Sequence, residues 1–129
     1  MHKFLKDIGI NSEQLPQSWF KDDKRQKEWK QQRKKYGLDE RELWNLDLTY
    51  CMWTYERLKM FEMTCPQELL DNTIKYKGKT YTVKKCIDII TKTFNDYLNK
   101  PIFEYNEKIQ SDIEKSHILL GKILHHLWW

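Results

Sequence analysis

A stretch of 25 residues without glycine or proline, from Asp39 to Met63, places the strongest constraint on the fold of this chain. It opens with Asp39 and Glu42, the spacing of a capping box, in which the side chains of two residues three apart bond each other's backbone N–H groups at the start of a helix. We therefore expect one continuous helix here. Its apolar residues occupy most of its circumference, which is typical of a helix at the centre of a bundle.

Polar side chains nevertheless recur within this apolar stretch. A buried polar group without a partner costs about 1–3 kcal/mol, so these side chains form either an internal network or a ligand site. Guanidinium groups fork onto phosphate, and Trp or Tyr rings stack on bases. One hypothesis is a pocket for a small anionic, nucleotide-like ligand, lined by the following residues: Arg41, Trp44, Asn45, Asp47, Tyr50, Trp53, Arg57, Trp128 and Trp129.

A basic segment precedes the central stretch, because residues 21–35 hold eight Lys or Arg against three acids. We expect a helix from about Asp22 that ends with Gly37 as its C′ residue. Its only apolar residues, Trp29 and Tyr36, are seven apart and should anchor one face. The basic residues form a solvated face, a surface that follows phosphate groups, or a surface for an acidic partner. The net charge of +4 is mild and argues against nucleic acid as a partner.

Three further elements follow the central stretch. Alternation of apolar and polar residues over 74–82, with a turn at Gly78, predicts a small β-hairpin or an extended loop. Thr82 is a good N-cap for a helix from Val83 to Leu98. Apolar residues at helical spacing predict a last helix over about 101–127.

Together these signals predict a mainly α fold, a compact helical bundle with a long central helix and a small β-hairpin or extended loop near residues 74–82. The length of 129 residues favours a single helical domain over residues 1–129. Trp128 and Trp129 close the chain, and because Trp rings are seldom left in solvent we expect them to dock on another helix or on a neighbouring subunit. A homo-oligomer is therefore one interpretation.

Motifs of catalysis and cofactor binding are missing from the sequence. It has no P-loop, GxGxxG or GxSxG pattern. The three cysteines form no CxxC pair, and the four histidines form no HxxxH or HExxH pattern. We expect no enzyme, no metal site and no cofactor. Unpaired cysteines, and the lack of an apolar run long enough for a signal peptide or membrane span, predict a reducing cytoplasmic setting and no membrane partner.

The run GLDERELWNLD from Gly37 to Asp47, the run ERLKMF from Glu56 to Phe61 and the terminal LWW resemble small uncharacterised proteins of tailed bacteriophages and prophages. The family pattern is G-x-x-x-R-E-x-W-N-L-D, then P-R-L-K-x-F, then a helix that ends in two tryptophans. Glu56 stands where the family often has proline, which removes the kink expected there. The resemblance implies a phage origin and a location in the host cytoplasm, and it implies no activity.

Two functional hypotheses follow from these observations. In the first, the protein is a phage-encoded, non-enzymatic binding protein that sequesters a nucleotide-like molecule, in the manner of a counter-defence factor. The alternative is a protein–protein interaction module, an inhibitor of a host protein or a phage assembly factor, that uses the basic helix and exposed tryptophans. Nucleic-acid binding would instead require an affinity that falls steeply with salt.

Overall fold

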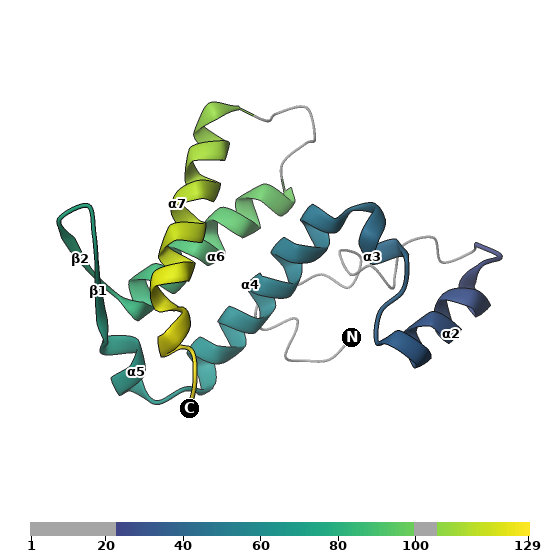
Figure 1. Cartoon of the computed structure of the whole chain (residues 1–129), viewed down its shortest axis with the longest axis horizontal. Coiled ribbons are helices and arrows are strands. Elements are labelled where there is room, and N and C mark those ends of the chain that lie inside the picture. Colours follow the sequence, from purple (N-terminus) through teal and green to yellow (C-terminus); the bar gives the residue numbers. More distant parts are fainter. Residues whose placement is uncertain (1–22, 100–105) are drawn as a thin grey trace. The chain divides into compact units, whose positions relative to one another are not determined.

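The structure is a computed structural model that describes residues 23–99 and 106–129. Over these residues the fold is mainly α with one small hairpin, which confirms the predicted fold class (Figure 1). Contacts within the chain divide it into two compact units, residues 1–53 and residues 54–129. The boundary between the units falls within the long helix α4 (Leu46–Thr64). The single domain over residues 1–129 stays a prediction.

Unit 1 begins with the basic helix α2 (Gln26–Tyr36). Gly37 ends α2 with a left-handed φ of 79°, and its N–H donates to the carbonyl of Arg33 at 2.9 Å, as predicted for a C′ glycine. Trp29 is fully buried, as expected of an anchor. Tyr36 is 64% exposed, so its predicted role as a second anchor is wrong. Its ring instead lies under the Lys35 ammonium, which is 4.9 Å from the ring centroid.

The central stretch is broken at Asn45, so the prediction of one continuous helix from Asp39 to Met63 is wrong. Helix α3 (Arg41–Trp44) ends there, and α4 begins at the next residue. The backbone of Asn45 has φ of −128° and ψ of 64°, outside the helical region. Thr49 Oγ1 donates to the carbonyl of Glu42 at 2.8 Å and so satisfies an acceptor that the break would otherwise leave unbonded. Helix α4 then runs without interruption through Glu56.

Unit 2 contains the second part of α4 and the elements that follow it (Figure 1). In chain order these are α5 (Gln67–Asp71), β1 (Thr73–Tyr76), β2 (Lys79–Thr82), α6 (Val83–Asn99), α7 (Glu107–Ile123) and the short 3-10 helix η4 (Leu124–His126).

Strands β1 and β2 form the predicted hairpin. They pair antiparallel, with Thr73 opposite Thr82 and Tyr76 opposite Lys79. The two residues between them, Lys77 and Gly78, have φ of 49° and 74°. Two consecutive positive φ angles are what a tight type I′ hairpin turn requires, because its twist matches that of the strands. The turn therefore lies where the sequence places it.

Helices α6 and α7 supply most of the core of unit 2 and lie side by side (Figure 1). Thr82 Oγ1 accepts from the backbone N–H of Lys85 at 3.0 Å, which confirms Thr82 as the cap of α6. The Phe94 ring of α6 lies 5.5 Å from the His117 ring of α7, centroid to centroid. Each helix turns one apolar face toward this core, with the following residues buried: Val83, Cys86, Ile87, Ile90, Phe94, Ile109, Leu119 and Ile123.

The last helix is shorter than the sequence predicts. Asn106 caps α7, because its Oδ1 accepts from the backbone N–H of Ile109 at 3.0 Å. The predicted start near residue 101 lies outside the described residues. At the other end α7 stops at Ile123 and tightens into η4, so the predicted continuation of the α-helix to Leu127 is wrong. Tightening into a 3-10 turn is a common way for a helix to end.

Candidate functional site

The nine residues predicted to line a ligand pocket are divided between the two units. Six of them belong to unit 1, and Arg57, Trp128 and Trp129 belong to unit 2. Trp128 and Trp129 are 70% and 66% exposed, so the prediction that they dock on another helix of the chain is wrong. Docking on a neighbouring subunit stays a prediction. Arg57 pairs with its neighbour Glu56 at the surface.

Arg41 belongs to a buried ion-pair network. Its Nε and Nη2 donate to the two oxygens of Asp39, each at 2.8 Å, and its backbone N–H donates to Asp39 Oδ1 at 3.1 Å. Arg33 Nε reaches the same carboxylate at 2.9 Å, while Arg33 Nη2 binds Glu42 Oε2 at 2.9 Å. Asp39 and Arg41 are 1% and 3% exposed. One carboxylate therefore bridges two guanidinium groups, one from α2 and one from α3.

The network explains the ionisation of Asp39. The hydrogen bonds from Arg41 lower the pKa of the Asp39 carboxyl to about 2, with a further contribution from Arg33, against the opposing effect of burial. The capping box contributes to the same cluster, because Glu42 Oε2 accepts from the backbone N–H of Asp39 at 3.3 Å. The Asp39 carboxylate thus accepts a backbone N–H at the start of α3 and binds two guanidinium groups at once.

Trp29 packs beside this network. Its indole N–H donates to Glu40 Oε1 at 2.8 Å. The guanidinium carbons of Arg41 and Arg25 lie 4.4 Å and 4.9 Å from the centroid of its ring. Trp44 meets it edge to face, with ring centroids 5.8 Å apart. Cation–π contacts of this kind contribute about 0.5–2 kcal/mol each, so Trp29 fixes α2 against α3 through its ring as well as its N–H.

Sequence reasoning missed Asp39 and Glu40 as partners of Arg41 and Trp29. The capping-box spacing singled out Asp39 and Glu42, but only as backbone caps. Arg33 lies six residues before Asp39 across the Gly37 turn, a separation at which no regular helix or strand period brings two side chains together. The folding back of the chain at Gly37 supplies that contact.

Four of the predicted residues lie at the break in the helix or on α4 directly after it. Asn45 forms the break itself. Asp47 lies in the first turn of α4, where a carboxylate is favoured by the helix dipole. Tyr50 and Trp53 share one face of α4 with Leu46, since the three are spaced four and three residues apart. We call Leu46, Tyr50 and Trp53 the apolar stripe.

The apolar stripe is exposed along its length. Leu46, Tyr50 and Trp53 are 57%, 40% and 55% exposed. In α3, Leu43 and Trp44 are also exposed. Single exposed apolar residues are ordinary, but a row of large ones at helical spacing is typical of an interaction surface.

A cationic hollow of about 430 Å³ opens on α2. Its lining includes four cations and Trp29, and no carboxylate among the described residues; those that line it are Gln26, Lys27, Trp29, Lys30, Arg33 and Arg41. Arg41 is therefore one predicted ligand residue that does line a cavity. The other eight do not line this hollow.

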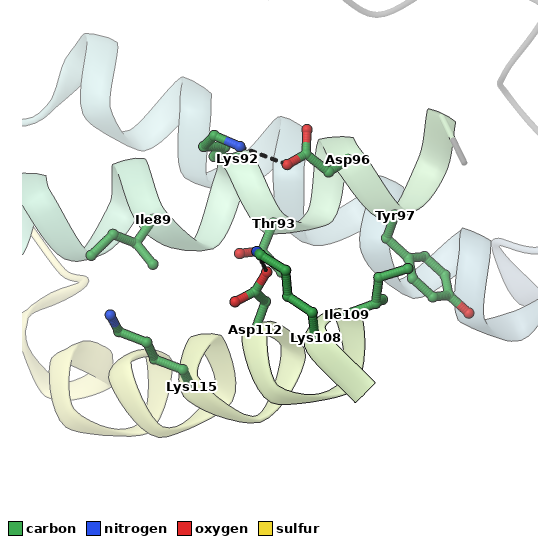
Figure 2. Close-up of a pocket in the computed structure, with 9 residues that line it drawn as sticks. All are labelled: Ile89, Lys92, Thr93, Asp96, Tyr97, Lys108, Ile109, Asp112 and Lys115. Atoms are coloured by element: carbon green, nitrogen blue, oxygen red, sulfur yellow. Dashed lines mark hydrogen bonds and ion pairs between the residues drawn. The ribbon is translucent and has the colours of Figure 1, made fainter. Parts of the chain in front are cut away.

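A second cavity, of about 260 Å³, lies between α6 and α7 in unit 2 (Figure 2). Ile89 and Ile109 line it together with charged side chains from both helices. Lys92 Nζ binds Asp96 Oδ2 at 2.7 Å, and Lys108 Nζ binds Asp112 Oδ2 at 2.8 Å. These are exposed pairs four residues apart along one helix, each worth about 0.3–0.5 kcal/mol. Most of the charge in this cavity is therefore paired within its own walls.

The described residues contain no group of three or more His, Cys, Asp or Glu side chains that could hold a metal ion. Burial, with a smaller contribution from the charge of Asp47, raises the pKa of the Cys51 thiol to about 12. Burial also raises the pKa of Cys65 and of Cys86. A thiol with a raised pKa stays protonated at neutral pH and is a poor nucleophile.

Comparison of the chain with models of protein families, with curated proteins and with solved structures gives no match. Among the described residues, no helix is both long enough and apolar enough to cross a bilayer.

Proposed function

We propose that the protein is an interaction module that binds a protein partner through unit 1, with the apolar stripe as the contact surface. The observation that carries this proposal is the exposure of Leu46, Tyr50 and Trp53 along one face of α4. Trp and Tyr residues contribute a large share of binding energy at protein interfaces, because they bring much contact area and lose little side-chain entropy. The stripe supplies one of each.

The charge of unit 1 indicates the chemistry of the partner. Lys27, Lys30 and Lys34 lie on one face of α2 and are exposed, and none of them forms an ion pair with a residue that the structure describes. Trp44 of α3 contacts Trp29 of α2, with ring centroids 5.8 Å apart, and the Arg25 guanidinium before α2 lies 5.1 Å from its ring centroid. The partner proposed is a protein whose surface combines apolar and acidic side chains. A second copy of this chain, itself carrying +4, is a poorer electrostatic match.

The resemblance to phage proteins supports a setting in the infected cell. In that setting the partner is a host protein that the module inhibits or a phage assembly factor. A counter-defence role is the proposal for the host case. Both cases use the same surface.

The test combines crosslinking with purified components. A photoreactive amino acid replaces Tyr50 in one protein and Ile118, which is 45% exposed on α7, in a matched control. A partner crosslinked in infected cells through position 50 and not through position 118 is then purified, and its dissociation constant is measured by calorimetry. Leu46→Glu and Trp53→Glu should each weaken binding by about tenfold or more, whereas Ile118→Glu should leave it unchanged.

Two outcomes would reject the proposal. Equal affinity of Trp53→Glu and the unaltered protein for the purified partner would place the interface elsewhere. A dimer of the unaltered protein in light scattering that becomes a monomer on Trp53→Glu substitution would make the stripe a self-association surface.

The affinity for an acidic partner should also fall as the salt concentration is raised, because exposed charges are screened.

A further inference from the structure

We infer that the cationic hollow on α2 is a binding site for a small anion that carries at least two phosphate charges. This inference goes beyond the proposed partner, because it concerns a small ligand held by α2 and the Asp39 network. It shares Lys27 and Lys30 with the acidic contact proposed above but does not involve the apolar stripe, and the small-anion probes below test it without the protein partner. The volume of about 430 Å³ falls within the roughly 300–1,000 Å³ range of ligand pockets.

The carboxylates of the described residues compensate only part of the charge around the hollow. Lys27, Lys30, Arg33 and Arg41 line it, and Asp39 and Glu42 bind the two guanidinium groups. Among the described residues, these two carboxylates are ion-paired with the two guanidinium groups, so the two lysine charges of the lining are left without an ion pair. Neither Lys27 nor Lys30 forms an ion pair or a hydrogen bond within the described ranges. A ligand with two or more negative charges would balance these two lysine charges.

Arg33 is held in position for such a ligand. Its Nε and Nη2 are occupied by Asp39 and Glu42, so the plane of the guanidinium is fixed by two ion pairs of 2.9 Å. Its Nη1 makes no hydrogen bond to a residue that the structure describes. A guanidinium ordered in advance loses less entropy on binding an anion. Lys27 and Lys30, one helical turn apart on the rim, provide flexible ammonium groups.

The burial of Trp29 limits how much the part of the ligand beyond its phosphates can contribute to binding. The Trp29 ring is fully buried, with the guanidinium groups of Arg25 and Arg41 near its centroid, so it offers no face on which a base could stack. Recognition therefore depends on the phosphates. Affinity should rise with the number of phosphate charges and should differ little among nucleobases.

Calorimetry on the full chain tests this, with inorganic phosphate, pyrophosphate, ATP and GTP as probes. We expect pyrophosphate, ATP and GTP to bind, phosphate to bind more weakly, and ATP and GTP to match within about twofold. Lys27→Gln combined with Lys30→Gln should weaken pyrophosphate binding by about tenfold or more. Lys30→Gln alone should weaken binding by about threefold or more, and Lys34→Gln is its matched control: it removes one charge from the same face of α2, outside the lining of the hollow, and should change affinity less than about twofold.

Three results would overturn the inference. No binding of pyrophosphate or ATP at millimolar concentration is the first. The second is an equal loss on Lys34→Gln, which would show diffuse attraction to the helix rather than a site. The third is tighter binding of a single-stranded oligonucleotide than of ATP together with a steep salt dependence, which would assign the α2 lysines to nucleic acid. Melting curves of each variant check that the fold is intact.

Discussion

The indole N–H of Trp29 donates a 2.8 Å hydrogen bond to Oε1 of Glu40, eleven residues further along the chain. The bond crosses the Gly37 turn and joins the middle of α2 to the start of α3. Glu40 is held in turn by Gln32, whose Oε1 accepts from the Glu40 backbone N–H at 2.9 Å. The described part of unit 1 thus depends on polar contacts around one buried ring.

Replacement of Trp29 by phenylalanine tests that bond. Trp29→Phe keeps an aromatic ring but removes the N–H donor, so Glu40 loses a charge-assisted hydrogen bond and stability should fall by about 1.5–3 kcal/mol. Urea denaturation followed by circular dichroism measures the change. Trp128→Phe, at a position that is 70% exposed, is the control and should stay within about 0.5 kcal/mol. Equal losses in the two variants would contradict the structure.

Asp39→Asn should destabilise the protein far more than a surface carboxylate variant. It leaves the buried Arg41 and the half-buried Arg33 without their shared anion, and breaking a buried ion pair costs about 3–5 kcal/mol. Asp112→Asn breaks the exposed pair with Lys108 and should cost about 0.5 kcal/mol or less. Thermal unfolding of both variants compares them, and similar melting temperatures would show that Asp39 is not a structural centre.

The free energy of unfolding should fall at acidic pH, over a pH range set by the pKa of Asp39. Because the folded pKa of about 2 lies below the unfolded value of 3.8, the stabilisation is complete above about pH 4 and is lost as pH falls toward 2. At about 1.4 kcal/mol per pKa unit, the loss from this group amounts to about 2.5 kcal/mol. Asp23, paired with Arg25, also has a pKa of about 2. The difference between the pH profiles of the unaltered protein and Asp39→Asn therefore isolates Asp39.

Substitution by alanine should change the stability of the protein in opposite directions at two glycines. Gly78 has a φ of 74°, which alanine adopts only with strain, so Gly78→Ala should cost about 1 kcal/mol. Gly121 lies in helix α7, and a Cβ there would meet nothing within 4 Å, so Gly121→Ala should stabilise the protein by about 0.5–1 kcal/mol. Melting temperatures that move in the same direction would contradict one of the two assignments.

The local signals in the sequence predicted most of the secondary structure. The end of α2, the hairpin turn and the cap of α6 each depend on one residue and its immediate neighbours. A glycine or a hydroxyl at the right place was therefore sufficient to predict these features; the residues are Gly37, Gly78 and Thr82. The burial of Trp29 followed from its position as one of two apolar residues on a basic helix. The hairpin and the cap of α6 were predicted for the same local reasons.

What the sequence could not predict depends on contacts between segments. Periodicity treats Asn45 as one more helical position, because the apolar spacing continues across it, while its backbone leaves the helix. The partners of Arg41 and Trp29 follow from the way the chain folds back at Gly37. The sequence assigned Tyr50 and Trp53 to a ligand pocket, and periodicity alone could not show that they lie exposed on one face of α4.

The break at Asn45 gives the run Trp44-Asn45-Leu46-Asp47 a structural role. These four residues change the direction of the chain between α3 and α4: Trp44 ends one helix, Asn45 takes a backbone outside the helical region, and Leu46 and Asp47 begin the next. A search for distant relatives should therefore treat Asn45 as a hinge position that must accept a non-helical backbone. Substitutions that preserve this bend should be tolerated even where the side-chain chemistry changes.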